Sequence, residues 1–543
     1  MNDRSTEIKR KGDKDGNTIT EPEEILKRWN EYGKTLFSGL SDENEKLRPE
    51  ELLVNAETEP LPLLDEVKAA VRELKSRKAS GLDGIPGEVL KFVGESGMKA
   101  IHHLCCKIWE TCQWPTDWKS QEFVMLHKGG NIKDCSNYRT IALISHSRKV
   151  LLIIILNRQK SKIEQELSDC QAGYRINRGT IDMLFVLQIL TEKVRNSDQE
   201  MYITFIDYSK AFESVKHNHL FNTMDLMGFP KHLMKLIAGL YSDQRATIQW
   251  DDKKCEFFNI TKGVTQGCIL SPHLFNIYTE KIMQEADIDQ LGVNINGRNL
   301  TNLRYADDTA LMSHNITSMR RILHRVDESG KKAGLKLNAK KTKVMQLKPE
   351  NSSLYDLKID QTVLENVEDF KYLGSVRTID GSCSKDIKMR IGMAKKKKIE
   401  LNNVWKDHNI PIEVKLKLLK CLIWPVMMYG CEAWSQKKDH DKRIEAAEMW
   451  FYRRILRVKW TDKRTNESVL KELKTERTLL NLINARKLKY VGHALPNHRT
   501  SLMETVCEGR LDGRIRKGRP PMSLLTNLTT ACGLSLHQII QKS

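Results

Sequence analysis

Residues Leu303–Met312 read Leu-Arg-Tyr-Ala-Asp-Asp-Thr-Ala-Leu-Met, so two adjacent aspartates, Asp307 and Asp308, lie between two mainly apolar runs. This pattern predicts a strand, a tight turn and a second strand, with the acids at the tip. Aspartate is disfavoured inside strands and common in turns, which supports that placement. Two neighbouring carboxylates repel each other, and hard oxygen ligands of this kind suit Mg²⁺. Taken alone, a solvated Asp-Asp turn is the more common explanation of such a pair.

A third carboxylate, Asp207, follows the nearly continuous apolar stretch Met201–Ile206. Such a stretch predicts a buried central strand, and we expect a helix to begin directly after it, at Tyr208. An ionised acid at this junction is costly unless a metal or hydrogen-bond donors meet it. Three acids could hold two Mg²⁺ ions, one activating a 3′-hydroxyl and the other steadying a pyrophosphate. Phe212, on the first turn of the expected helix, would lie under the sugar and exclude a 2′-hydroxyl.

Two cations and a glycine-rich loop complete the candidate site. Lys128 ends a predicted strand and Arg139 enters the next one, where they could grip a triphosphate as a point charge and a planar fork. Either residue alone is more often a surface cation. The loop Lys262–Pro272 contains Gln266, which offers a donor and an acceptor beside glycines that permit close approach to a flat ligand. The GxxxG pattern alone would be weak evidence.

The composition favours a globular protein with an anionic partner. The chain has 543 residues, 40% hydrophobic residues and a net charge of +19, so several domains and a polyanion partner are expected. A merely soluble basic protein is the alternative. The 12 cysteines lack the paired spacing of a zinc site and are expected to be reduced. The N-terminus has no apolar signal core, and the run Val150–Leu156 is too short to span a bilayer, so we expect an intracellular protein without membrane contact.

The chain is expected to fall into four parts: a polar extension over 1–60, a mixed α/β region over 61–385, a helical region over 386–460 and a basic region over 461–543. Within 1–60, a short helix over 23–37 is expected to be an appendage. Solvated charge is the usual reading of basic runs, but their concentration after the acidic region predicts a nucleic-acid track. Its candidate residues are Lys341, Lys395, Lys396, Lys397, Lys398, Arg453, Arg454 and Arg457, with further basic stretches at Arg486–His493 and Gly513–Pro520.

These motifs together resemble the reverse transcriptases of non-LTR (LINE-type) retrotransposons, in particular the jockey- and RTE-like enzymes. The resemblance covers roughly residues 20–525, and the matching segments come in the family's order. They are Lys78–Ile85, Asn137–Ile141, Gln171–Arg175, Phe205–Asp207 with Ala211–Phe212, Gly263–Cys268, Tyr305–Asp308, Gly334–Thr342 and Phe370–Gly374.

The resemblance implies an α+β right-hand polymerase of fingers, palm and thumb, with an antiparallel palm sheet followed by a helical basic C-terminal region. It implies catalysis by Asp207, Asp307 and Asp308, with the Tyr208 carbonyl as a further metal ligand. Two Mg²⁺ ions are the implied cofactor, with Mn²⁺ as a substitute. The nucleotide-binding residues it implies are Lys128, Arg139, Phe212, Gln266, Gly267, Tyr305 and Ala306.

The implied partners are an RNA template, a DNA primer and deoxynucleoside triphosphates. An endonuclease activity is expected from another chain or a missing domain. The expected location is the nucleus, with a cytoplasmic ribonucleoprotein stage. The sequence departs from the family at Glu213, where aspartate is usual, at Thr265, where arginine is common, and at Ile269, where proline is frequent. None of these changes removes an expected metal ligand.

Two other hypotheses compete with an active polymerase. A decayed or domesticated copy would bind nucleic acid without extending primers, and the intact acids argue against it. An RNA-templated RNA polymerase or a maturase-type relative is the other, and it is disfavoured by the bulky Phe212 and by the LINE-type tail.

Overall fold

The computed structural model describes residues 11–12, 18–38, 57–197, 199–348, 354–494, 501–511, 523–533 and 538. The chain divides into two compact units, each assembled from separate segments. Unit 1 comprises Met1–Ser168, Tyr208–Ala286 and Val326–Leu337, and unit 2 comprises Asp169–Asp207, Asp287–Arg325 and Asn338–Ser543. The boundaries of these units differ from those expected from the sequence, because residues of the expected region 61–385 belong to both units.

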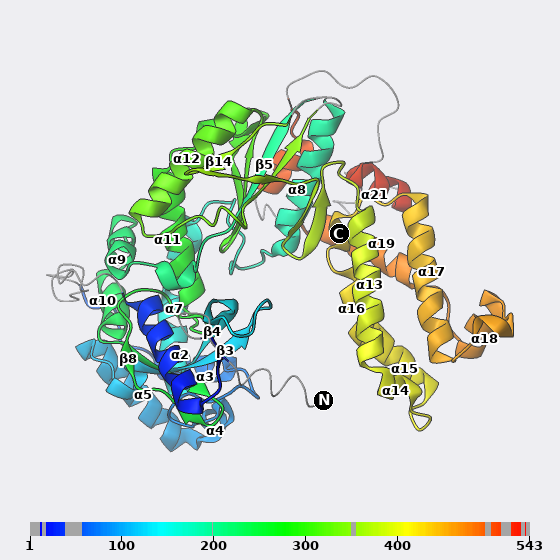
Figure 1. Cartoon of the computed structure of the whole chain (residues 1–543). Helices are drawn as coiled ribbons and strands as arrows, with labels where there is room; N and C mark the ends of the chain where they lie inside the picture. The colour runs from blue at the N-terminus through cyan, green and yellow to red at the C-terminus, as the bar shows by residue number, and fades with distance from the viewer. Residues whose placement is uncertain are drawn as a thin grey trace. The chain divides into compact units, whose positions relative to one another are not determined.

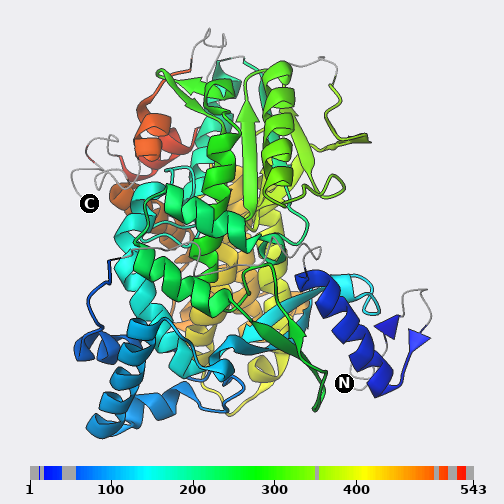
Figure 2. The same ribbon diagram turned by 90° about the vertical axis from the view of Figure 1, so that its left-hand side faces the viewer.

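Unit 1 contains a mixed sheet. Strand β3 pairs antiparallel with β4 and parallel with β6, and two short strands, β7 and β8, pair with β6. Helix α2 packs on β6 and β8, and Figure 2 shows this dark-blue helix beside the cyan and green strands. The bounds are α2 Pro22–Phe37, β3 Ser120–His127, β4 Tyr138–Leu143, β6 Arg245–Trp250, β7 Lys253–Lys254 and β8 Phe258–Asn259.

Helix α2 confirms the helix expected over 23–37, but it is not an appendage. Its apolar face buries Ile25, Trp29 and Phe37, each at most 1% exposed. The Phe37 ring stacks on Phe123 of β3 with centroids 5.0 Å apart. This face therefore forms part of the core of unit 1, because burial of large apolar side chains is the main driving force for folding.

The helical stretch from Gly87 to Thr111 in unit 1 is interrupted once. It is broken at Val93, and Gly94 has a φ of +68°, a conformation that glycine adopts without strain. The other elements are β1 Lys11–Gly12, β2 Thr18–Ile19, α3 Leu64–Glu73, α4 Gly87–Phe92, α5 Gly94–Thr111, α6 Thr116–Lys119, α7 His146–Glu166, α9 His217–Leu226, α10 Lys231–Tyr241 and α11 Ser271–Glu285.

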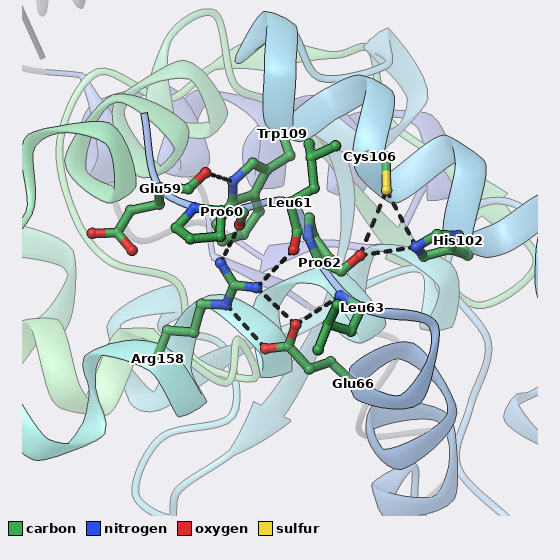
Figure 3. Close-up of polar contacts among 10 residues, drawn as sticks. All are labelled: Glu59, Pro60, Leu61, Pro62, Leu63, Glu66, His102, Cys106, Trp109 and Arg158. Carbon is green, nitrogen blue, oxygen red and sulfur yellow. Dashed lines mark hydrogen bonds and ion pairs between the residues drawn. The ribbon is translucent and has the colours of Figure 1, made fainter. Parts of the chain in front are cut away.

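An extended segment at residues 59–63 is fastened to three of these helices (Figure 3). Arg158 of α7 forms a fork on both carboxylate oxygens of Glu66, at 2.9 and 2.7 Å, and also donates to the carbonyl oxygens of Pro60 and Leu61. The indole nitrogen of Trp109 donates to the Glu59 carbonyl at 3.0 Å. The charge-assisted bonds of Arg158 and the neutral bond of Trp109 together hold the segment between α3, α5 and α7.

Unit 2 is organised around a five-stranded sheet in the order β11-β12-β5-β13-β16. The first four strands are antiparallel, and β16 adds in parallel at one edge. All six residues of β5 are buried, which confirms the expected central strand. Helix α8 shares the hydrophobic core beside this sheet. The bounds are α8 Thr180–Asn196, β5 Met201–Ile206, β11 Asn302–Tyr305, β12 Asp308–Ser313, β13 Lys343–Leu347 and β16 Glu365–Asn366.

The predicted α+β class and the antiparallel sheet are therefore confirmed. Other elements of unit 2 include a helix, α12, whose last turns belong to unit 1, and several two-stranded ribbons. They are β9 Val293–Ile295, β10 Arg298–Leu300, α12 Ile316–Lys332, β14 Lys358–Ile359, β15 Thr362–Val363, β17 Asp369–Tyr372 and β18 Ser375–Thr378.

The described residues after 383 are mainly helical, as predicted, and α13 packs against α16 (Figure 1) and also contacts α17. Between residues 412 and 428 the helix is interrupted by a π-helical turn at Leu419–Ile423, just before Pro425, whose missing N–H prevents a regular helix. The bounds are α13 Ser384–Glu400, α14 Asn402–Lys406, α15 Ile412–Leu418, α16 Trp424–Met428, α17 Lys438–Ile455, α18 Asn466–Leu473, α19 Leu479–Ala494, α20 Ser501–Glu508 and α21 Leu524–Cys532.

Within the described part of the chain, no helix is both long enough and apolar enough to cross a membrane.

Candidate active site

The acidic pair lies on the predicted hairpin, which belongs to unit 2. Tyr305 of β11 pairs with Asp308 of β12, so Ala306 and Asp307 form the two-residue loop. Ala306 has a φ of +56°, in the left-handed region that only glycine adopts readily. Both aspartates are exposed, whereas Ala306 is 5% exposed. The tight turn therefore presents the two carboxylates to solvent from a fixed backbone.

Asp207 directly follows β5, the neighbour of β12. Ile206 lies opposite Thr309, and the same antiparallel register continued by one residue places Asp207 opposite Asp308. Lys341, one of the predicted nucleic-acid contacts, places its ammonium 3.7 Å from Asp207 Oδ2. That oxygen is buried and accepts no hydrogen bond from any residue that the structure describes. An unsatisfied buried carboxylate oxygen is costly, and a cation relieves the cost.

The metal site itself stays a prediction. Among the described residues, no group of three or more histidine, cysteine, aspartate or glutamate side chains is close enough together to hold a metal ion. The sheet nevertheless brings the backbones of Asp207 and Asp308 to neighbouring strands. Tyr208, whose carbonyl was expected to join the ligands, has a buried side chain that is 7% exposed.

The predicted triphosphate cations lie in unit 1, on one end of the β3–β4 pair. Leu126 lies opposite Arg139, and the backbone N–H of Lys128 donates to the Asn137 carbonyl at 2.8 Å. Both cationic side chains are exposed. The antiparallel pairing thus brings Lys128 and Arg139 to the same end of one hairpin.

The Gly-Gln loop and Phe212 also meet in unit 1. The Val264 N–H donates to the Phe212 carbonyl at 2.8 Å, and the Ala142 N–H donates to the Gln266 carbonyl at 2.7 Å. The Phe212 ring is 9% exposed and stacks on Phe275 with centroids 4.5 Å apart. The helix expected to begin at Tyr208 is wrong, because the segment forms turns and only a short 3₁₀ helix, Phe212–Ser214.

Glu213 has a role in this loop that the sequence did not reveal. Its Oε1 accepts hydrogen bonds from Gln266 Nε2 at 3.2 Å and from Thr140 Oγ1 at 3.4 Å. Burial raises the pKa of the Glu213 carboxyl, and the nearby Lys128 ammonium opposes that rise. Glu213 therefore orients the Gln266 amide. The only hint of this role in the sequence is its position directly after Phe212, because its hydrogen-bond partners lie more than 50 residues away.

His217 supports the other end of the same loop and gives a pH prediction. It is 4% exposed, its Nε2–H donates to the Gly263 carbonyl at 2.8 Å, and burial lowers its pKa from 6.5 to about 4. A lowered pKa in the folded state contributes stability above pH 6.5 that is lost as the pH falls towards 4. At roughly 1.36 kcal/mol per pKa unit, we expect a loss of about 3 kcal/mol over that window.

This loss can be measured by urea unfolding at pH 7 and at pH 4.5. In His217→Gln, which keeps a side-chain donor but does not titrate, the drop in unfolding free energy should be smaller by about 2 kcal/mol. Equal drops in the two proteins would contradict the assignment.

The predicted nucleic-acid track is only partly available on the surface. Lys341, Lys396, Arg454 and Arg457 are exposed, and Arg454 lies over the Trp450 ring at 5.3 Å. The other four are partly or fully buried: Lys395, Lys397, Lys398 and Arg453.

Two of the basic predictions need correction. Lys398 is 9% exposed because it shares the buried face of α13 with Ala394, and burial lowers its pKa, so it is a poor phosphate contact. Lys487, in the stretch Arg486–His493, is fully buried and donates to the Trp434 carbonyl at 2.6 Å. The stretch Gly513–Pro520 lies outside the described residues.

Residues 126–376 match the family described as reverse transcriptase (RNA-dependent DNA polymerase). The RNA-directed DNA polymerase from mobile element jockey of Drosophila melanogaster is 22% identical over 410 residues, which cover 73% of this chain and 44% of that protein. The retrovirus-related Pol polyprotein from type-1 retrotransposable element R2 of Popillia japonica is 26% identical over 278 residues, which cover 49% of this chain and 39% of that protein. The chain thus spans less than half the length of these two relatives.

Among solved structures, telomerase from Candida albicans in complex with a fragment of telomeric RNA is 9% identical and covers 84% of this chain and 82% of its own, with a TM-score of 0.40.

Proposed function

We propose that the chain is the RNA-directed DNA polymerase of a non-LTR retrotransposon and extends a DNA primer along an RNA template, because residues 126–376 match the reverse transcriptase family. The observation that carries the proposal is the pairing of the Asp307–Asp308 hairpin with β5, the strand that Asp207 directly follows. A decayed, binding-only copy would have no need of this arrangement, and all three acids are present.

The chemistry of these residues suits divalent ions, although their side chains are not gathered closely enough here to form a metal site. The buried Asp207 Oδ2 has no hydrogen-bond partner among the described residues, and two further carboxylates lie on the adjoining hairpin. Asp207, Asp307, Asp308 and the Tyr208 carbonyl would hold two Mg²⁺ ions, which when bound would acidify the primer 3′-hydroxyl and offset the charge of the leaving pyrophosphate. Mn²⁺ would fit the same oxygen ligands.

Other side chains of the chain would bind the nucleotide, the template and the primer. Lys128 and Arg139 would neutralise the triphosphate, Arg139 as a fork on two oxygens. Gln266, oriented by Glu213, would offer its remaining amide groups to the incoming nucleotide, beside Gly267. Tyr305 and Ala306 would support the nucleotide from the hairpin. The exposed Lys341, Lys396, Arg454 and Arg457 would contact template and primer phosphates.

A primer-extension assay on poly(rA)/oligo(dT) with Mg²⁺ tests the proposal. We expect incorporation of thymidine nucleotides that requires both the template and the primer. Binding of the template without any incorporation, in Mg²⁺ and in Mn²⁺, would overturn the proposal in favour of a binding-only remnant.

Phe212 should set the choice of sugar. Its ring is held by Phe275, so a 2′-hydroxyl would meet a fixed surface rather than a mobile side chain. Phe212→Ala is expected to weaken discrimination against ribonucleotides by about 10- to 100-fold, since the ring can no longer clash with the hydroxyl. The measurement is the ratio of kcat/KM for dTTP and UTP. Phe212→Tyr keeps the bulk and should keep the ratio, and unchanged selectivity in Phe212→Ala would refute this role.

The proposed substrates also suggest where the chain works. A primer 3′-hydroxyl in chromosomal DNA would place it in the nucleus after a cytoplasmic stage with its RNA. The strand cleavage that exposes that hydroxyl would come from an endonuclease activity on another chain or domain.

A further inference from the structure

The turn that carries Asp307 is braced by a segment remote in sequence, Gln171–Tyr174, which lies in the same unit. The Ala172 N–H donates to the Arg304 carbonyl at 2.9 Å, and the Arg304 N–H donates to the Cys170 carbonyl at 2.8 Å. Gln171 and Arg304 therefore form a parallel bridge along β11. The segment runs along the strand that leads directly into the acidic turn.

The side chain of Gln171 makes the contact closest to the acids. Its Oε1 accepts the N–H of Ala306 at 3.0 Å and the N–H of Gly173 at 2.8 Å. The first of these donors belongs to the loop residue that immediately precedes Asp307. One oxygen thus ties the tip of the hairpin to the bracing segment.

Packing alone does not explain a glutamine at this position. Gln171 is completely buried, and its Nε2 has no hydrogen-bond partner among the described residues. A buried donor without a partner is unfavourable, and an apolar side chain would avoid it. The two bonds to Oε1 fix the orientation of the amide. The contribution of Gln171 is therefore a hydrogen-bond acceptor held at this position.

The backbone of the turn needs such support. Ala306 holds a φ of +56°, which an alanine adopts only when its surroundings impose it. The segment also fits closely, because a Cβ added to Gly173 would lie 2.4 Å from the Ala306 nitrogen. Small errors in the position of a reacting group lower rates sharply, so fixing this turn bears directly on catalysis.

We propose that Gln171 is a positioning residue that holds the Ala306–Asp307 turn in its catalytic conformation through the hydrogen bond to the Ala306 N–H. The inference rests on the proposed polymerase function, which gives the turn its purpose. Gln171 does not itself touch the nucleotide or the primer in this scheme.

The matched variants are Gln171→Met and Gln346→Met. Gln346 is another buried glutamine of unit 2, 2% exposed, and it bonds to the Tyr355 backbone at 2.7 and 3.0 Å from the end of β13 remote from Asp207. Both substitutions keep the length of the side chain and remove its hydrogen bonds. Gln346→Met therefore reports the cost of losing such bonds without touching the catalytic turn.

Hydrogen exchange of a peptide covering Ala306 is the readout that does not depend on activity. Gln171→Met should speed exchange of the Ala306 amide by about 10-fold or more, since its acceptor is gone. Gln171→Glu retains an oxygen acceptor and should keep exchange slow, whereas Gln346→Met should leave it unchanged.

Kinetics supply the second readout. Gln171→Met should lower kcat for primer extension by about 10- to 100-fold, because the turn positions Asp307 for the chemical step. The KM for dTTP should change less than about twofold, because the proposed triphosphate contacts of Lys128 and Arg139 are left intact. An Ala306 exchange rate that is the same in Gln171→Met as in the wild type would overturn the proposal. A loss of kcat in Gln346→Met as large as that in Gln171→Met would also overturn it. If the wild-type chain fails to extend primers while exchange still responds to Gln171, the polymerase function falls and the bracing of the turn stands.

Discussion

Replacing Asp307 with asparagine is expected to reduce primer extension on the order of 10³-fold, because loss of this proposed metal ligand would remove several kcal/mol of transition-state stabilisation. Asparagine keeps the size of the side chain and removes only its charge. Asp307 is exposed at the tip of the hairpin, so the free energy of unfolding should change by less than about 0.5 kcal/mol. The measurement is single-turnover extension on poly(rA)/oligo(dT), with urea unfolding of the same samples.

A closely matched control lies on another hairpin. Asp251 and Asp252 form the two-residue loop between β6 and β7, and Asp251 has a φ of +51°, much like Ala306. Asp252→Asn therefore removes the same charge from the same kind of turn and should leave extension unchanged. Extension that survives Asp307→Asn would refute the assignment of the catalytic acids, whatever the control shows.

Replacing Trp29 with alanine is expected to cost about 3–5 kcal/mol of stability, the usual range for removing a large buried aromatic side chain. Trp29 is completely buried, and its ring lies 5.2 Å from Tyr138 and 5.6 Å from Trp250, on two strands of the unit 1 sheet. Since Tyr138 precedes Arg139, the proposed triphosphate fork should also become less well ordered. Urea unfolding measures the first effect and the KM for dTTP the second.

Trp460 provides the comparison for this change. Its side chain is 89% exposed, so Trp460→Ala should alter the unfolding free energy by less than about 0.5 kcal/mol. A loss below about 1 kcal/mol in Trp29→Ala would mean that α2 contributes little to the core, as the sequence alone had suggested.

The fold was predictable where short-range patterns decide it. The alternation around Asp307 predicted the hairpin, and the apolar run before Asp207 predicted the central strand. The prediction that the helix over 23–37 is an appendage was wrong, because its packing partner is distant in sequence. The spacing of Ile25 and Trp29 shows an apolar face but not its partner, and that partner, β6, begins more than 200 residues later.

The candidate residues of the site could be proposed from the sequence, but their contacts could not. Lys398 and Lys487 look like surface cations in the sequence, because a basic run does not show which of its members faces the core. Gln171 belongs to a segment that carried the family resemblance, yet its role depends on the N–H of Ala306, 135 residues away. No local spacing rule connects two such positions.

The central position of β5 in its sheet has a consequence for how the chain is made. Its two neighbours, β12 and β13, lie at 308–313 and 343–347, so a ribosome must release about 140 further residues before both edges of β5 are paired. Until then an apolar strand has open hydrogen-bonding edges, which are templates for aggregation. Pairings this distant in sequence also form slowly. A nascent or truncated chain that ends before residue 347 would therefore be the form most in need of a chaperone.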